Sequence, residues 1–180
     1  DMVIDGGPCH IGVESTIIEC TGEDRVTILR PGGITIDMLK EVVPHVRLDT
    51  NLVTGQGVPK APGMKYRHYA PSAPMTVAVG TVDEVADKLQ ELYTNAQREK
   101  KTVGFLVSKE VGDRFPNEHM FVWGRHEDKE SLARQLYNGL LSFDKDKVDV
   151  ILAEGVDGEG LGMAVMNRMK KAAGGNVILL

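Results

Sequence analysis

The sequence predicts an α/β protein whose larger part, residues 75–180, is a three-layer domain with a mostly parallel β-sheet. In that part, short apolar segments alternate with longer segments in which apolar residues recur every three or four positions, as strands and amphipathic helices do in turn. One short segment, VDVILAEG at residues 148–155, is almost continuously apolar, which is typical of a strand buried on both faces of a parallel sheet. Helices that connect parallel strands cover both faces and complete the three layers.

The first 50 residues have a different composition, because β-branched residues are separated there by glycine, proline and polar turns. Short strands are predicted for DMVID, VESTIIEC and RVTILR, at residues 1–5, 13–20 and 25–30. After the turn PGG, residues 34–44 predict one short helix. It ends at Pro44, since proline cannot continue a helix.

The elements of residues 75–180 follow in strand and helix order. MTVAV, at 75–79, is the first strand, and Thr81 with Glu84 has the spacing of a capping box at the start of the next helix. Further strands are predicted at 103–108, 119–123, 148–155 and 176–180, and further helices at 128–143 and 160–173.

Residues 51–74 are predicted to be an irregular linker, because glycines and prolines interrupt every periodic pattern. At its centre, APGMKYRHYAP places Lys65, Tyr66, Arg67, His68 and Tyr69 in consecutive positions. The aromatic rings could stack on a base, while the cationic side chains could meet a negative charge. The segment could equally be a tether between domains, and a tether that lies across a pocket also serves as its lid.

The composition is that of a globular protein, with 42% hydrophobic and 26% charged residues. No apolar run approaches the roughly 20 residues of a membrane span, and the N-terminus lacks the pattern of a signal peptide. We therefore expect a cytoplasmic location and no membrane partner. The net charge is −5, and no acidic residue lies between Asp49 and Asp83, so the linker favours an anionic ligand over broad nucleic-acid binding.

Cysteine and histidine spacing predicts no metal site formed by the protein alone. Cys9 and Cys20 match no common zinc spacing and are expected to be buried thiols. A Cys9 nucleophile with His10 as its base is the weaker alternative, because adjacent residues seldom face each other. The remaining histidines, His45, His119 and His126, form no paired motif.

Three polar residues in the first 50 positions are candidates for ligand binding. Ser15 and Thr16 are adjacent in a predicted strand, so their hydroxyls face opposite sides and at least one meets a buried or ligand-filled surface. Arg30 ends a predicted strand just before PGG, and its planar guanidinium suits two phosphate oxygens. The alternatives are ordinary strand propensity for Thr16 and a solvated side chain for Arg30.

The segment GVDGEGLG, at residues 155–162, imitates a dinucleotide-binding fingerprint between a strand and a helix. Met163 stands where the third glycine is required, and Glu154, Asp157 and Glu159 would repel a pyrophosphate. We interpret it as a structural turn. The rival hypothesis is an unrelated small α/β nucleotide-binding protein that uses this turn.

Four motifs, in the order GGPCHIGVESTIIE, ILRPGGIT, APGMKYRHYAP and GLGMAVMNRMKKAA, together resemble the C-terminal portion of the threonylcarbamoyl-AMP synthase family in its long, two-domain form. The resemblance implies that residues 1–50 are the final strands and helix of a YrdC-like catalytic domain. It implies that residues 51–74 are a linker or lid over the active site. Residues 75–180 would then be the Rossmann-like C-terminal domain.

The resemblance also implies an activity, that of a nucleotidyltransferase. Such enzymes join L-threonine, bicarbonate and ATP into threonylcarbamoyl-AMP and release pyrophosphate, with Mg²⁺ expected to assist and ATP as a substrate. The product serves tRNA modification, so tRNA or tRNA-modifying proteins are the expected partners.

Roles for individual residues follow from the matched motifs alone. Substrate binding is implied for Ser15 and Thr16, with Ser15 on the threonine or its carbamoyl group. Nucleotide binding is implied for Arg30 and for the linker residues Lys65, Arg67, His68 and Tyr69. Catalytic residues are not assigned, and no metal ligands are expected.

The family's basic signature and its nucleotide loop precede the part that this sequence matches, so we expect this chain alone not to form the adenylate. The alternative is a regulatory or RNA- or nucleotide-binding α/β module without catalytic activity.

Overall fold

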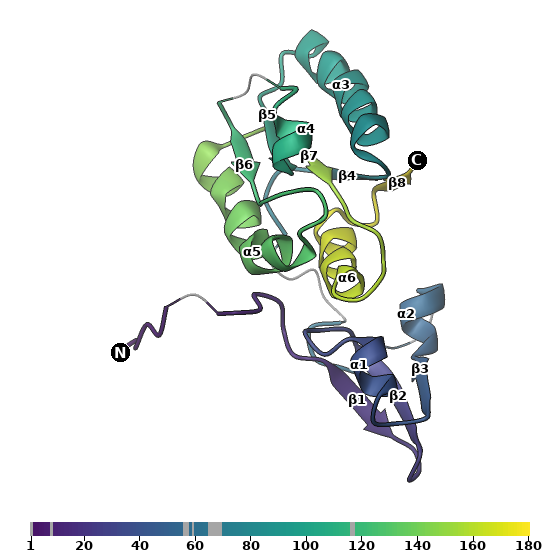
Figure 1. Ribbon diagram of the computed structural model, residues 1–180. Coiled ribbons are helices and arrows are strands. Elements are labelled where there is room, and N and C mark those ends of the chain that lie inside the picture. The colour runs from purple at the N-terminus through teal and green to yellow at the C-terminus, as the bar shows by residue number, and fades with distance from the viewer. Residues whose placement is uncertain (1, 8, 56–57, 59, 65–69, 116–117) are drawn as a thin grey trace.

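The computed structural model of the 180-residue chain describes residues 2–7, 9–55, 58, 60–64, 70–115 and 118–180. Its elements form two groups, which Figure 1 shows in purple to blue and in teal to yellow. The first group contains a three-stranded sheet and the second a five-stranded sheet. Each sheet is described below with the helices that accompany it.

The first sheet has the order β1-β2-β3, formed by Ile17–Cys20, Arg25–Arg30 and His45–Leu48. β1 and β2 are antiparallel, whereas β2 and β3 are parallel. Two short helices accompany this sheet, α1 at Ile36–Lys40 and α2 at Thr50–Thr54. The prediction of a strand at RVTILR is confirmed, and the predicted helix is present but shorter. The sequence patterns missed β3 and also α2, which lies inside the predicted linker.

Near the N-terminus, the strand predicted at residues 1–5 is wrong, and the one predicted at 13–20 is confirmed only for its second half, β1. Residues 2–5 form no strand, and Met2, Val3 and Ile4 are about 90% exposed (88%, 91% and 88%), because no other strand of the described chain pairs with them. Ser15 and Thr16 precede β1 instead of lying inside it. Thr16 bonds to Ile34 beyond the PGG turn, so this part of the chain follows the turn and not a strand ladder.

The second sheet has the order β6-β5-β7-β4-β8, and every neighbouring pair in it is parallel. Its strands, in chain order, are β4 Met75–Val79, β5 Val103–Val107, β6 Met120–Val122, β7 Val150–Glu154 and β8 Val177–Leu179. The predicted α/β fold with a mostly parallel sheet is therefore confirmed.

Helices cover both faces of this sheet (Figure 1). They are α3 Val82–Arg98, α4 Lys109–Gly112, α5 Lys129–Asp146 and α6 Gly162–Ala172. Successive residues of β5 separate the two cores, because Phe105 packs with buried residues of α3 and α4, whereas Leu106 packs with those of α5 and α6. This alternation is what a strand buried on both faces requires.

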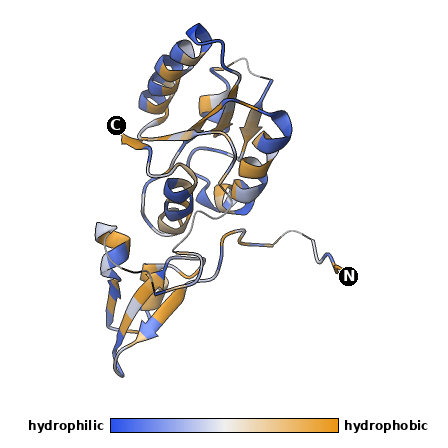
Figure 2. Cartoon of the chain, turned by 180° about the vertical axis from the view of Figure 1, so that it is seen from behind, coloured by the Kyte–Doolittle hydropathy of each residue, from blue (hydrophilic) through white to orange (hydrophobic). Residues whose placement is uncertain are grey.

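Local sequence accounts for the helices that the pattern predicted. The Thr81 side chain accepts from the Glu84 backbone, and the Glu84 carboxylate accepts in return from the Thr81 backbone, which confirms the capping box of α3. Figure 2 shows apolar colour concentrated on the strands, with the helices polar on their outer sides. Among the described helices, none is both long and apolar enough to cross a membrane.

Candidate functional site

Ser15 and Arg30, two residues that the sequence pointed to, lie in direct contact. The antiparallel pairing of β1 and β2 places Ile17 opposite Arg30, and Ser15, two positions before Ile17, lies beside the guanidinium. Arg30 donates to the Ser15 carbonyl from Nε at 3.1 Å and from Nη2 at 3.0 Å. Its Nη2 also lies 3.3 Å from Ser15 Oγ. The pair therefore presents a hydroxyl beside a positive charge.

Thr16 has its hydroxyl engaged within the chain. Its Oγ1 donates to the Ile34 carbonyl at 2.7 Å and accepts from the Ile34 amide at 3.0 Å. Gly32 permits this approach, since a Cβ there would lie 2.3 Å from both the Glu14 carbonyl and the Thr16 amide nitrogen. These contacts give Thr16 a structural role, and its part in substrate binding stays a prediction.

The linker turn lies against Arg30 on one side and α6 on the other. Arg30 Nη1 donates to the Pro62 carbonyl at 2.9 Å, and Lys171 Nζ donates to the Gly63 carbonyl, also at 2.9 Å. The next residues along the chain, the predicted nucleotide-binding Lys65, Arg67, His68 and Tyr69, lie outside the described residues. Their predicted roles are neither confirmed nor contradicted.

A network that the sequence patterns missed holds the residue just before Ser15. Glu14 Oε2 accepts from Arg168 Nε and from the Tyr137 hydroxyl, each at 2.7 Å. Arg168 also donates from Nη2 to the Pro31 carbonyl at 3.2 Å. The signal that could have revealed Arg168 was its place in GLGMAVMNRMKKAA, a motif noted as a whole without a role for any of its residues.

Burial and pairing shift the pKa values of this network. Burial alone would raise the pKa of Glu14, but hydrogen bonds from Arg168 and Tyr137 outweigh it and hold the pKa below its usual range. Burial, followed by the Glu14 hydrogen bond, raises the pKa of Tyr137 well above normal. Burial, followed by the nearby Arg168 cation, lowers the pKa of Lys171 to about 8.

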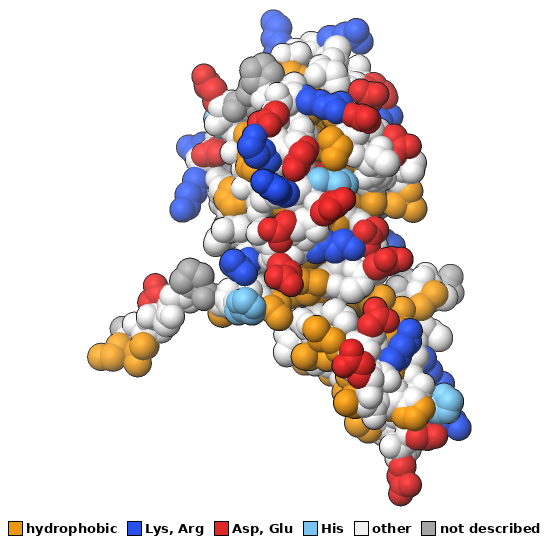
Figure 3. Space-filling model, viewed as in Figure 1, with side chains coloured by type: hydrophobic (Ala, Val, Ile, Leu, Met, Phe, Trp, Pro, Cys, Tyr) orange, Lys and Arg blue, Asp and Glu red, His pale blue; other side chains and the backbone are white. Residues whose placement is uncertain are grey.

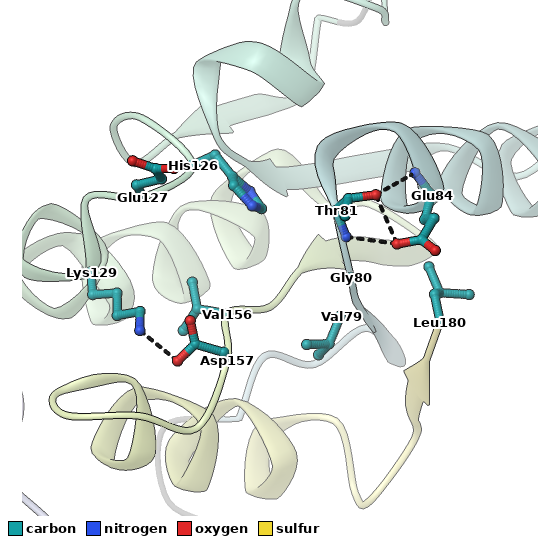
Figure 4. Close-up of a pocket in the computed structure, with 10 residues that line it drawn as sticks. All are labelled: Val79, Gly80, Thr81, Glu84, His126, Glu127, Lys129, Val156, Asp157 and Leu180. Atoms are coloured by element: carbon teal, nitrogen blue, oxygen red, sulfur yellow. Dashed lines mark hydrogen bonds and ion pairs between the residues drawn. The ribbon is translucent and has the colours of Figure 1, made fainter.

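A separate cavity of about 620 Å³ lies at the carboxyl edge of the parallel sheet (Figure 4). β4 and β7 are neighbours, and the helices that follow them, α3 and α6, cover opposite faces. Ligands of open α/β sheets commonly bind at such a point. The cavity is lined by Val79, Gly80, Thr81, Glu84, His126, Glu127, Lys129, Val156, Asp157 and Leu180.

Several polar side chains of this cavity are engaged in hydrogen bonds or ion pairs. Lys129 donates to Asp157 at 2.5 Å, and Glu84 is part of the α3 cap. His126, which lines the cavity, has its Nδ1 2.5 Å from the carboxylate of the fully buried Glu154. More carboxylates than cations therefore surround the cavity, which disfavours a pyrophosphate and fits the interpretation of residues 155–162 as a structural turn.

Both cysteines contradict the expectation of burial, because Cys9 and Cys20 are exposed. Cys9 lies in the N-terminal segment without regular structure, and Cys20 ends β1, which is an edge strand. In the described part of the chain, no group of three or more His, Cys, Asp or Glu side chains could hold a metal ion.

These observations define an α/β protein with two sheets. Arg168 and Lys171 of α6, in the parallel-sheet domain, contact the segments around the Ser15–Arg30 pair of the smaller sheet. A family model described as "Threonylcarbamoyl-AMP synthase, C-terminal domain" matches residues 34–174. The chain belongs to the threonylcarbamoyl-AMP synthase family. The resemblance inferred from four motifs is confirmed, and the hypothesis of an unrelated nucleotide-binding protein is wrong.

Curated relatives from two domains of life are similar to nearly the whole chain. The Bacillus subtilis threonylcarbamoyl-AMP synthase is 40% identical over 176 residues, which cover 98% of this chain and 49% of that protein. The Pyrococcus abyssi synthase is 43% identical over 180 residues, which cover 99% of this chain and 51% of that protein. This chain thus spans about half the length of the curated relatives it matches.

A solved structure supports the fold. The crystal structure of P. abyssi Sua5 complexed with L-threonine superimposes with a TM-score of 0.86 at 41% identity. The match covers 98% of this chain and 50% of that chain. Both the three-stranded group and the parallel-sheet domain therefore fall within the matched region.

Proposed function

We propose that this chain supplies one wall of the substrate pocket of an L-threonylcarbamoyladenylate synthase, an ATP-dependent nucleotidyltransferase of tRNA modification. The single observation that carries the proposal is the contact of Arg30 with Ser15 and with the linker at Pro62. Membership of the family and the complex of the P. abyssi relative with L-threonine support it.

The proposed reaction needs positive charge and hydrogen-bond donors close together. A carbamate oxygen of N-carboxylated threonine attacks the α-phosphorus of ATP, the bond to the β-phosphate oxygen breaks, and pyrophosphate leaves with the electron pair. Negative charge grows on the phosphate oxygens, so preorganised cations lower the barrier. Arg30 supplies a cation in hydrogen-bond contact with Ser15.

In this proposal Ser15 binds threonine or its carbamate. Its side chain is exposed, and its Oγ accepts from Arg30, which leaves the hydroxyl hydrogen available to a carboxylate or carbamate oxygen. Arg30 acts on the ATP phosphates or ribose while holding the serine backbone. Thr16 keeps the segment in place through Ile34 and supports the same wall.

The linker is proposed to cover the nucleotide. Arg30 and Lys171 fix the turn at Pro62 and Gly63, and Lys65, Arg67, His68 and Tyr69 follow within six residues of Gly63. A strap anchored at this point begins beside the Ser15–Arg30 pair. Its cationic and aromatic side chains suit a phosphate and a base.

Mg²⁺ is expected from the resemblance, as a partner of the ATP phosphates. The described residues offer no cluster of three or more metal-ligating side chains, and so we assign no step on this chain to the ion. Partners in tRNA modification and a cytoplasmic location belong to the same proposal.

The remaining pocket would come from the half of the relatives that this chain does not match. Large hydrophobic side chains are exposed on and near the first sheet, among them Ile34, Met38 and Val42, at 52%, 51% and 76%. Figure 3 shows orange side chains gathered over that group and at the tip of the N-terminal segment. Apolar surface of this kind fits contact with another part of a protein.

Pyrophosphate release tests the proposal. The 180-residue chain is assayed alone and after fusion behind the N-terminal half of the B. subtilis relative, with ATP, L-threonine and bicarbonate. We expect release from the fusion and none from the chain alone. Arg30→Ala in the fusion should lower kcat/KM by about 100-fold, whereas Arg98→Ala, on the exposed side of α3, should leave it unchanged. An inactive fusion, or an Arg30→Ala fusion as active as the unmodified one, would count against the proposal.

A further inference from the structure

Two of the three cationic residues of helix α6, Arg168 and Lys171, contact chain segments outside the parallel-sheet domain and are not used directly by the proposed reaction. Val165, Met169 and Ala172 anchor the helix in the core of the parallel-sheet domain. Arg168 and Lys171 lie three positions apart and reach out of that domain, toward the first sheet and the linker. Because the helix is packed into a core, its position is fixed, and so are the positions from which these two side chains bind their partners.

Arg168 contacts the chain directly beside two of the predicted binding residues, Ser15 and Arg30. Arg168 binds the carboxylate of Glu14, which precedes Ser15. It also binds the carbonyl of Pro31, which follows Arg30. A single guanidinium therefore holds both segments that meet in the Ser15–Arg30 pair.

Lys171 extends the same arrangement to the linker. Its Nζ donates to the Gly63 carbonyl at 2.9 Å and lies 3.3 Å from Met64 Sδ. Met64 directly precedes Lys65 and the rest of the predicted nucleotide-binding run. One face of α6 thus contacts all three segments from which the proposed wall is made.

The chain before Ser15 is docked on the neighbouring helix as well. Val13 is buried within the core of the parallel-sheet domain. A Cβ on Gly12 would lie 2.6 Å from the Ala133 carbonyl, so this segment runs directly against the backbone of α5. Arg134 Nε donates to the His10 carbonyl at 3.3 Å.

Burial makes the Arg168 joint more rigid than an ordinary surface ion pair. The side chain of Arg168 is 6% exposed and that of Glu14 is 30% exposed. Exposed ion pairs contribute little to stability, because solvent screens the charges and both side chains lose conformational freedom when they pair. A buried guanidinium left without its partner is costly, which favours the one arrangement in which Glu14 and Pro31 are both in place.

We propose that Arg168 is a positioning residue for the synthase reaction and that, with Lys171, it makes α6 the part that sets the Ser15–Arg30 pair and the linker in register. This inference rests on the proposed function. It assigns the parallel-sheet domain a task in substrate binding that its side chains perform without touching substrate. A purely structural joint between two groups of elements is the competing explanation.

The first test is kinetic and uses the fusion protein of the preceding section. Arg168→Met keeps the bulk of the side chain and removes its charge and donors. We expect kcat/KM to fall by about 100-fold, since a displacement of about 1 Å can have that effect, with a raised KM for L-threonine. Arg168→Lys keeps the charge near Glu14 but cannot reach both partners, and should recover part of the loss. Arg98→Met on α3 is the matched control and should behave like the unmodified fusion.

A double-variant cycle separates positioning from general stability. If Arg168 acts through Glu14, the double variant Arg168→Met/Glu14→Gln should show a smaller fold-loss of kcat/KM than the product of the fold-losses of the two single variants. Thermal unfolding of every variant is measured alongside. Loss of kcat/KM at a temperature well below each unfolding midpoint supports positioning. Losses that simply multiply would contradict action through Glu14.

The second test needs no catalysis and uses the 180-residue chain by itself. Hydrogen exchange is compared between the unmodified chain and Arg168→Met. We expect faster exchange at the amides of residues 12–17 and of Ala61, Gly63 and Met64, with unchanged protection in β4, β5 and β7. Unchanged exchange at residues 12–17 would overturn the inference. An inactive fusion with this local loss of protection would instead contradict the proposed function, whereas the finding that Arg168 holds residues 12–17 and the linker turn in place would stand.

Discussion

Arg168 on α6 donates to Glu14 at 2.7 Å, although the two residues are 154 positions apart in the chain. The contact joins the parallel-sheet domain to the residue that precedes Ser15. In this ion pair the side chain of Arg168 is 6% exposed. The stability of this joint should therefore respond to the ionisation of Glu14.

Acid should weaken the joint. The hydrogen bonds from Arg168 and Tyr137 lower the pKa of folded Glu14 below its ordinary value of 4.5. A depressed carboxyl pKa gives stability that is fully present above pH 4.5 and is lost as the pH falls through the folded value. We expect the unmodified chain to be more stable than Glu14→Gln at pH 6 and to lose that advantage toward pH 3. Urea unfolding across this range measures the difference, and a pH-independent difference would contradict the assignment.

Alkaline pH should have the opposite effect at Lys171. Its folded pKa is about 8, compared with an ordinary value of 10.5. Below pH 8 the ammonium is charged in the folded and unfolded chains alike, and the cost of burying it near Arg168 is fully present. Between pH 8 and 10.5 the folded chain binds fewer protons, so its stability rises with pH. Relative to Lys171→Met, the unmodified chain should gain stability from pH 7 to 10, as measured by urea unfolding. A loss of stability over this range would contradict a lowered pKa for Lys171.

Gly32 should tolerate no larger residue. A Cβ at this position would lie 2.3 Å from the Glu14 carbonyl and the Thr16 amide nitrogen, and backbone cannot move aside as a flexible side chain can. We expect Gly32→Ala to lower the free energy of unfolding by about 1 to 3 kcal/mol. Gly22→Ala is the control, because the nearest atom to its added Cβ would lie 4.0 Å away. Equal urea midpoints for the two variants would rule out the close approach.

The cap of α3 gives a prediction far from the proposed site. Thr81 accepts from the Glu84 amide, and Thr81→Ala removes this acceptor. The free energy of unfolding should fall by about 1 kcal/mol. Thr94→Ala, in the middle of the same helix, removes a hydroxyl whose hydrogen bonds go to Gln90, one turn earlier, and should be neutral or slightly stabilising. Thermal unfolding of the pair distinguishes a cap from a general threonine effect.

The sequence predicted most of the parallel-sheet domain because its strands and helices obey simple periodicities. VDVILAEG became β7, and the capping box at Thr81 marked the start of α3 to the residue. The first sheet was harder. β3 has only four residues, at His45–Leu48, and is formed by pairing with β2 more than by any local pattern.

The candidate site was predictable only in part, because contacts between distant segments leave no local pattern. Ser15 and Arg30 were found through their residue types and their places beside strands. Arg168 was not, since an arginine in an amphipathic helix normally points to solvent. Cys20 was expected inside, because cysteine is among the most buried residue types, but it lies at the end of an edge strand.

The burial of Val13 among α5 and α6 side chains limits how this domain could be recombined with others. A graft that begins at the linker would leave behind the short peptide that fills a hollow in the transplanted half. Shuffling by evolution or in the laboratory would have to move residues 10–14 together with the domain, even though more than fifty residues separate them along the chain. The peptide around Val13 and the domain that buries it therefore behave as one structural unit, although they lie far apart in the sequence.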